Sequence, residues 1–136
     1  MIISIANQKG GVGKTTTSVN LSASIAVSER KTLIVDMDPQ CNTTTSFGIS
    51  YSGLYAHLYH VLIGKKDIRE VIRKTDVPFL DIVPSHPDLM GAEIELLDVE
   101  EREFVLKKAF DTLQETYTCV FIDCPPVEIV ADATII

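Results

Sequence analysis

The residues with the clearest chemical potential lie near the start of the chain, in the segment Gln8-Lys9-Gly10-Gly11-Val12-Gly13-Lys14-Thr15. Glycines let backbone N–H groups converge on anionic oxygens. A lysine that reaches the outer phosphates, followed by a hydroxyl that holds Mg²⁺, completes a phosphate-binding loop. Such loops usually begin with a glycine, where this chain has Gln8, and here a second lysine, Lys9, precedes the double glycine. The segment therefore predicts a phosphate site with an additional positive charge.

Carboxylates follow two apolar runs that read as buried strands. Asp36 and Asp38 come after the run at residues 32–35, and Asp123 comes after the run at 119–122. Parallel α/β sheets bind ligands beyond the carboxyl ends of their strands. Carboxylate oxygens suit Mg²⁺, and a positioned acceptor suits an attacking water. We expect the lysine loop and these carboxylates to meet at one edge of a sheet as a magnesium-nucleotide site.

Apolar periodicity predicts the elements that position these groups. Strands are expected at residues 2–6, 32–35, 79–83 and 119–122, and helices at about 15–27, 54–62, 67–72 and 99–116. Residues 39–53 are rich in Thr, Ser, Asn and Gly and read as a loop, with at most a short helical turn. The apolar residues of the first helix occupy two neighbouring faces, so we expect burial on more than one side. The alternation predicts an α/β fold with a mostly parallel sheet flanked by helices.

Length and composition limit the class of protein. The 136 residues are enough for one domain core, and 46% apolar and 23% charged residues are ordinary for a globular chain. The net charge of −7 disfavours a surface that coats nucleic acid in general. No apolar run approaches the roughly 18 residues of a membrane span. Strand-like residues begin at once, which leaves no room for a signal peptide. We therefore expect a cytoplasmic protein with no membrane contact.

Cysteines and histidines add no predicted chemistry. The three cysteines are scattered and read as buried structural thiols, with Cys119 and Cys124 pointing to opposite faces of their strand. The three histidines lack the spacing of metal ligands and read as surface or packing residues, namely His57, His60 and His86.

Together these motifs resemble those of the ParA/Soj partition proteins, within the ParA/MinD group of ATPases with a deviant phosphate-binding loop. Three segments carry the resemblance in the family's order: Asn7-Gln8 with the loop at 9–16, Asp36-Met37-Asp38-Pro39-Gln40 with Asn42, and Asp123-Cys124-Pro125-Pro126. The resemblance implies a P-loop NTPase fold. Residues 1–136 would form one domain that lacks the C-terminal part of the family fold, and residues 131–136 look like the opening of the next strand.

The resemblance also assigns roles to individual residues. It implies that the nucleotide is bound by Gly10, Gly11, Val12, Gly13, Lys14, Thr15 and Thr16. The metal site would consist of Thr15, Asp36 and Asp123. Catalysis would use Lys14 on the β/γ-phosphates, Asp38 to orient the attacking water, and Lys9. In this family, that lysine reaches across a nucleotide-sandwiched dimer to the partner's phosphates.

The implied function is an ATPase that acts in chromosome or plasmid segregation, with ATP or ADP and Mg²⁺ as cofactors. ATP would close a homodimer that binds DNA without sequence specificity, and a ParB/Spo0J-like partner would stimulate hydrolysis. DNA binding would associate the cytoplasmic protein with the nucleoid. The alternative is a non-hydrolysing nucleotide-binding or interaction module, which pairs with a ParB-like protein or with a full-length homologue.

Overall fold

A mostly parallel sheet forms the centre of this computed structural model, which describes residues 1–126 apart from the side chains of Glu93 and Glu103. The strands lie in the order β1-β5-β2-β4-β3. Their bounds are β1 (Ile2–Ile5), β2 (Thr32–Asp36), β3 (Arg73–Lys74), β4 (Leu80–Val83) and β5 (Cys119–Asp123). All neighbouring pairs are parallel except β3 with β4. The predicted sheet is confirmed, and the short antiparallel β3 is an addition. The strand expected at 131–136 lies outside the described residues.

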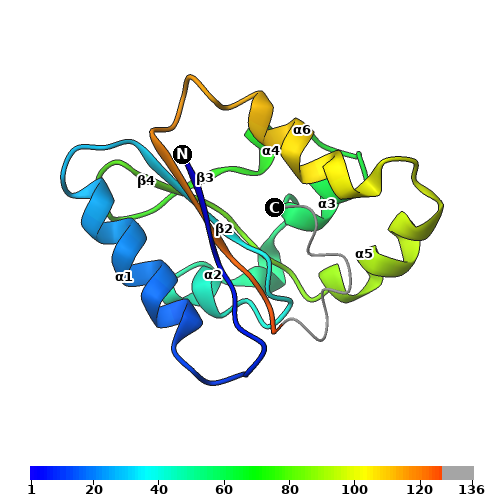
Figure 1. Cartoon of the computed structure of the whole chain (residues 1–136), viewed down its shortest axis with the longest axis horizontal. Helices are drawn as coiled ribbons and strands as arrows, with labels where there is room; N and C mark the ends of the chain where they lie inside the picture. Colours follow the sequence, from blue (N-terminus) through cyan, green and yellow to red (C-terminus); the bar gives the residue numbers. More distant parts are fainter. Residues whose placement is uncertain (127–136) are drawn as a thin grey trace.

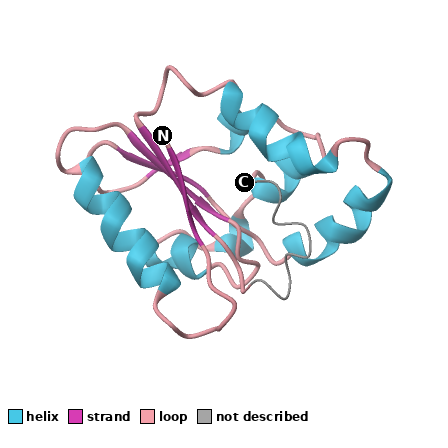
Figure 2. Cartoon of the chain, in the orientation of Figure 1, coloured by secondary structure: helices cyan, strands magenta, loops and turns pink. Residues whose placement is uncertain are grey.

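Helices cover both faces of this sheet (Figures 1 and 2). Helix α1 packs on one face, against β2 and β5, while α3, α4 and α6 lie over the other. The bounds are α1 (Lys14–Ala26), α2 (Asn42–Ser46), α3 (Leu58–Leu62), α4 (Ile68–Val71), α5 (Leu89–Glu95) and α6 (Val105–Asp111). Within residues 1–126, no helix has the length and apolar character needed to cross a membrane.

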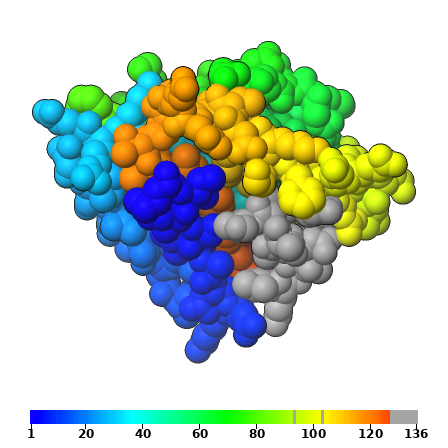
Figure 3. All heavy atoms as spheres, turned by 45° about the horizontal axis from the view of Figure 1, so that its top comes forward, coloured from blue at the N-terminus to red at the C-terminus, as the bar shows by residue number. Residues whose placement is uncertain are grey.

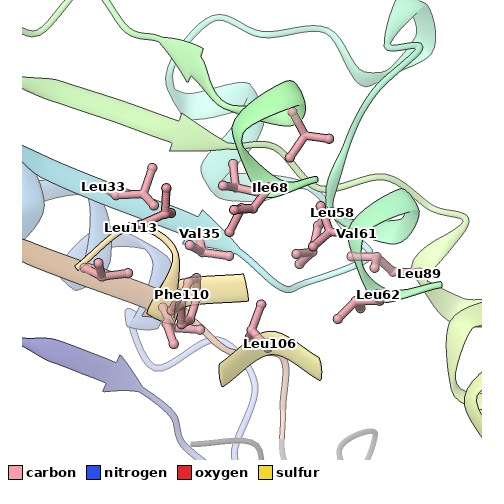
Figure 4. Close-up of a cluster of buried hydrophobic side chains, with 14 of the residues drawn as sticks. Leu33, Val35, Leu58, Val61, Leu62, Ile68, Leu89, Leu106, Phe110 and Leu113 are labelled. Carbon is pink, nitrogen blue, oxygen red and sulfur yellow. The ribbon is translucent and has the colours of Figure 1, made fainter. Parts of the chain in front are cut away.

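The central strand β2 is buried on both faces, as its continuous apolar sequence predicts. Leu33 and Val35 pack among residues of α3, α4 and α6, where Figure 4 shows them facing Leu58, Ile68 and Phe110. Ile34 points the other way, into the cluster beneath α1. All three β2 side chains are fully buried. The sheet therefore has a separate core on each side.

The cysteines are distributed between these two cores. Cys119 belongs to the cluster beneath α1, whereas Cys124 belongs to the opposite cluster. Both are buried and free, and so is Cys41. The expectation of buried structural thiols on opposite faces of β5 is confirmed.

Helix α1 differs from its prediction in the face that it buries. Its fully buried positions are Ser18, Ser22 and Ala26, which are spaced four residues apart. The second buried face that was expected at Leu21 and Ile25 is only partly present. Leu21 is 41% exposed, whereas Ile25 is partly buried against the cluster beneath α1. Small side chains let the helix approach the sheet closely, and the serine hydroxyls bond within the protein. Hydrophobicity alone could not identify this face.

The other helices are shorter than the sequence predicted. Helix α3 begins only at Leu58, and α6 covers only the middle of the stretch expected at 99–116. Glu101 adopts a left-handed conformation, with φ of 56°, at the entrance to a separate 3₁₀ turn (Arg102–Phe104), and this interrupts the longer helix. The capped helix after Asp67 is confirmed, because the Arg69 N–H donates to Asp67 Oδ1 at 2.8 Å. Helix α5 was not predicted.

Strand β1 forms one edge of the described sheet and pairs only with β5. Ile2 is half exposed there. Figure 3 shows these N-terminal residues, in dark blue, at the surface beside the orange segment that leads to β5. The phosphate loop thus continues from a strand that, within residues 1–126, is paired on one side only.

Candidate functional site

The carboxyl ends of three adjacent strands bring the predicted groups together. In the register of the sheet, Ile5 of β1 pairs with Asp123 of β5, and Asp123 pairs with Asp36 of β2. The phosphate loop leaves β1 at this edge and leads directly into α1. The strand order therefore places the loop and both carboxylates side by side, as the sequence predicted.

The phosphate loop depends on glycine at two positions. Gly11 and Gly13 have φ of 70° and 87°, in the left-handed region that other residues rarely adopt. Gly13 directly precedes α1, whose N-terminus has no side-chain cap and no acidic residue in its first turn. Backbone N–H groups at an uncapped helix start, together with the helix dipole, favour anions. The loop is thus built to receive phosphate.

A cavity of about 840 Å³ opens over this loop. Its volume lies within the range of about 300–1,000 Å³ that is usual for small-molecule sites. Seven of the predicted site residues line it: Gly10, Gly11, Gly13, Lys14, Thr15, Thr16 and Asp38. Five further residues complete the lining, namely Pro39, Gln40, Asn42, Met90 and Pro126. The remaining predicted site residues, Lys9, Val12, Asp36 and Asp123, do not line it.

The two loop lysines occupy different environments. The Lys14 ammonium donates to the carbonyl oxygen of Lys9 at 3.3 Å and borders the cavity. The backbone N–H of Lys9 donates to Asn7 Oδ1 at 3.0 Å, which fixes the turn before the glycines. The Lys9 side chain is exposed, and its ammonium has no partner within residues 1–126. Lys14 therefore borders the cavity, whereas the exposed Lys9 ammonium does not line it and contacts no other described residue.

Asp123 is a buried carboxylate held by three hydroxyl groups. Thr15 Oγ1 and Thr43 Oγ1 donate to its Oδ2 at 3.0 and 2.6 Å, and Ser18 Oγ donates to its Oδ1 at 3.0 Å. These contacts join α1 and α2 to the end of β5. Mg²⁺ binds hard oxygen ligands. Because Thr15 borders the cavity and contacts Asp123, this oxygen pair fits a magnesium site beside the phosphate loop.

Asp36 is fully buried and supports the surrounding backbone. Its Oδ2 accepts hydrogen bonds from the N–H and the hydroxyl of Thr44 at 2.8 and 2.6 Å, and its Oδ1 accepts the Asp38 N–H at 3.1 Å. Burial raises the pKa of Asp36 to about 7, with a smaller upward contribution from Asp123, although the Thr44 and Asp38 bonds oppose the shift. Asp36 therefore holds α2 and the following loop in place.

Asp38 keeps one carboxylate oxygen available. Its Oδ1 accepts the Gln40 N–H at 2.9 Å, whereas Oδ2 has no hydrogen-bond partner in the described part of the chain. Its backbone carbonyl accepts from Ser85 Oγ at 2.6 Å, which ties it to the end of β4. Because Asp38 lines the cavity, its free oxygen can accept a proton or orient a water there.

Several positioning residues were missed by sequence reasoning. Thr43, Thr44 and Ser18 hold the two buried aspartates, and Ser85 connects Thr44 to the Asp38 backbone, since the Ser85 N–H donates to Thr44 Oγ1 at 2.9 Å. The available signal was the run of hydroxyl residues after Asn42. In a segment that is predicted to be a loop, such a run does not indicate any particular role. The role becomes clear only when the fold shows that the strand ends face these hydroxyl groups.

Burial disfavours the thiolate form of the two cysteines near the site. Burial raises the pKa of both Cys41 and Cys124 to about 11, with further upward contributions from nearby aspartates. A thiol is reactive only as the thiolate. The chemistry of the site therefore rests on its lysines, hydroxyls and carboxylates.

Comparison with known sequences places the chain among related proteins. A family model described as "AAA domain" matches residues 1–135. The chain is 48% identical to the chromosome partitioning protein ParA of Myxococcus xanthus over 125 residues, which is 92% of this chain and 44% of that protein. It is 46% identical to the sporulation initiation inhibitor protein Soj of Bacillus subtilis, covering 92% of this chain and 49% of the relative. The chain thus spans about half the length of these relatives.

Comparison with solved structures also identifies similar proteins. A crystal structure of cobyrinic acid a,c-diamide synthase from Mycobacterium smegmatis, with a bound ATP analogue and magnesium, superposes with a TM-score of 0.89. The two chains are 38% identical, and the match covers 92% of this chain and 51% of the other. The fold that carries the cavity is therefore one that is also found in a protein crystallised with nucleotide and magnesium.

Proposed function

This chain belongs to the ParA/Soj family of partition ATPases, and from that premise we propose that it binds Mg·ATP in the cavity over its phosphate loop and takes part in DNA segregation. The observation that supports the proposal most directly is that the phosphate loop and the carboxylates lie together at one edge of the sheet. Lys14, Thr15 and Asp38 line one cavity, and Asp123 lies directly behind Thr15.

The proposed binding mode assigns each part of the loop a role. Backbone N–H groups from Gly10 to Gly13 and the start of α1 would surround the phosphates. The Lys14 ammonium would leave the Lys9 carbonyl and contact the β/γ-phosphates. Mg²⁺ would be held by Thr15, with Asp123 behind it, and would neutralise phosphate charge when bound.

Hydrolysis is a further step of the proposal and depends on Asp38. Its free Oδ2 would orient the attacking water, because the other carboxylate oxygen and the backbone carbonyl are fixed by Gln40 and Ser85. Asp36 would contribute by holding Thr44 and the turn at Asp38, and not by direct contact with the cavity. If Mg·ATP binds without release of phosphate, the chain would instead be a nucleotide-binding module.

The partners are proposed from the family. We infer that ATP binding favours a homodimer in which each Lys9 contacts the phosphates of the partner's nucleotide. The exposed Lys9 ammonium, which contacts no partner among residues 1–126, supports this inference. Non-specific DNA and a ParB/Spo0J-like protein would be the further partners. The match to the two relatives covers 44% and 49% of their length, so these partners rest on the family and not on the whole length of the relatives.

Nucleotide titration tests the binding proposal. Isothermal titration with ATP, in the presence and absence of Mg²⁺, would compare the wild type with Lys14→Ala and with Lys107→Ala. Lys107 is an exposed lysine on α6 that pairs with Asp111 at 3.1 Å, so it controls for loss of charge alone. We expect Lys14→Ala to lose about 10-fold or more in affinity, the size of a lost charge-assisted hydrogen bond. Equal affinity in all three proteins would contradict the phosphate role of Lys14.

A further inference from the structure

A cluster of imidazole rings lies outside the cavity over the phosphate loop, although these histidines lack metal-like spacing in the sequence. The rings of His57 and His86 are stacked, with centroids 4.1 Å apart and planes 9° from parallel. His60 contacts His57 from the side, at 4.2 Å between centroids. Asp88 stands beside His86, with its Oδ2 3.2 Å from His86 Nδ1. Three candidate ligand atoms, one each from His57, His86 and Asp88, lie within 4.8 Å of one another.

The backbone fixes these residues opposite each other. His57 directly precedes α3, and the N–H of the next residue, Leu58, donates to the Pro84 carbonyl at 3.0 Å. His86 follows two residues later in the connection from β4 to α5, and helices α3 and α5 pack together on the same face of the sheet (Figure 1). The cluster is thus a product of the fold, formed by residues about thirty positions apart in the sequence.

One atom of the cluster lacks a partner. His57 is 2% exposed, and its Nδ1 is buried without any hydrogen bond within the described residues. A buried polar atom left unsatisfied costs about 1–3 kcal/mol, and such atoms call for an explanation such as an ion. Burial, together with the neighbouring imidazoles, lowers the pKa of His57 and so favours the neutral ring. Neutral imidazole is the form that binds metal.

From this arrangement we propose that His57, His86 and Asp88 form a binding site for Zn²⁺, separate from the magnesium-nucleotide site. Two imidazoles and one carboxylate are a typical ligand set for zinc, whereas Mg²⁺ prefers oxygen alone. Zinc bonds of about 2.0–2.2 Å require the ligand atoms to move closer together. The Asp88 side chain is 56% exposed and that of His86 is 21% exposed, so both have room to rotate and leave a path for the ion.

The site would couple to the nucleotide cavity through one short segment. Ser85, which precedes His86, donates to the Asp38 carbonyl, and Met90, which follows Asp88 on α5, lines the cavity. Zinc at His86 and Asp88 would hold this segment against α3. The proposal does not depend on nucleotide binding, because the ligand set lies outside the cavity lining.

Metal titration of the full chain tests the site. Protein freed of metal with EDTA, and then freed of EDTA, would be titrated with Zn²⁺ calorimetrically without nucleotide, and with Co²⁺ by visible absorption. We expect one ion per chain. His86→Gln and Asp88→Asn should each weaken binding at least about 10-fold, the loss that follows even from removal of an outer-shell partner. Asp98→Asn, an exposed aspartate in the 3₁₀ turn (Leu96–Asp98) after α5, should leave affinity unchanged.

Three results would overturn the proposal: no saturable binding, equal affinity in wild type and both ligand variants, or a thiolate charge-transfer band with Co²⁺. The last would assign the ion to cysteine. His57 is buried, so its substitution is avoided, and circular dichroism would verify that the exposed variants remain folded. Failure of ATP binding would not affect this test.

Discussion

Thr43 and Asp123 are 80 residues apart in the chain, yet the Thr43 hydroxyl donates a buried hydrogen bond of 2.6 Å to Asp123 Oδ2. The same oxygen accepts from Thr15, the hydroxyl at the end of the phosphate loop. Helix α2 therefore helps to set the position of the carboxylate behind the proposed magnesium ligand.

Thr43→Val removes this bond while keeping the shape of the side chain. A lost hydrogen bond to a charged group lowers the free energy of unfolding by about 1.5–3 kcal/mol, and the freed carboxylate should weaken the Mg²⁺ dependence of ATP binding. Urea denaturation and calorimetry would measure the two effects. Thr45→Val is the matched control, because Thr45 lies on the same helix, is exposed and bonds only to nearby carbonyls. Equal behaviour of the two variants would contradict the role of Thr43.

Asp36 should give the stability of the protein a recognisable pH dependence. Its pKa of about 7 in the fold lies above the ordinary value of 3.8, so the folded state retains a proton that the unfolded state releases. The stabilising contribution of Asp36 to the free energy of unfolding is therefore largest below about pH 4. It declines as pH rises towards 7 and stays constant above that. Asp36→Asn cannot ionise, so the difference in stability from wild type should change over this window. Parallel curves for the two proteins would reject the raised pKa.

Asp38→Asn should separate binding from hydrolysis. The amide can still accept the Gln40 N–H, so the turn should persist, but it cannot act as a carboxylate toward water. We expect similar Mg·ATP affinity and phosphate release slower by about 100-fold or more. A colorimetric phosphate assay would measure this, with Asp76→Asn as a control in the exposed turn before β4, at the opposite end of the strand. Wild-type turnover in Asp38→Asn would show that another group orients the water.

Lys9→Ala should keep nucleotide binding and lose ATP-dependent dimers, because the exposed ammonium does not line the cavity of its own chain. Light scattering with saturating Mg·ATP would report the mass, and Lys65→Ala, an exposed lysine in the turn after α3, is the control. Dimers of equal stability in both variants would refute the contact in trans. A wild type that stays monomeric would refute dimerisation itself.

The sequence was sufficient to predict those parts of the fold that depend on local sequence patterns. The apolar run at residues 32–35 predicted the buried strand β2, and the glycines at residues 10–13 predicted the phosphate loop. In contrast, α2 is stabilised by hydrogen bonds from Thr43 and Thr44 to aspartates on two strands. Because these bonds are not visible in the local sequence, the run of hydroxyl residues was predicted to be a loop. The stacking of His57 on His86 likewise depends on the path of α3 and α5 over the sheet, which no local pattern encodes.

The two halves of the proposed nucleotide site come from strands with different protection against local opening. Asp36 and Asp123 end β2 and β5, which are paired on both sides, whereas the phosphate loop follows β1, which within residues 1–126 pairs only with β5. Local opening is easiest where few buried contacts hold a segment. Fraying of β1 would release the loop while both carboxylates stay in place. A ligand that bridges loop and carboxylates therefore closes this opening, and amide hydrogen exchange in β1 would slow as the site fills.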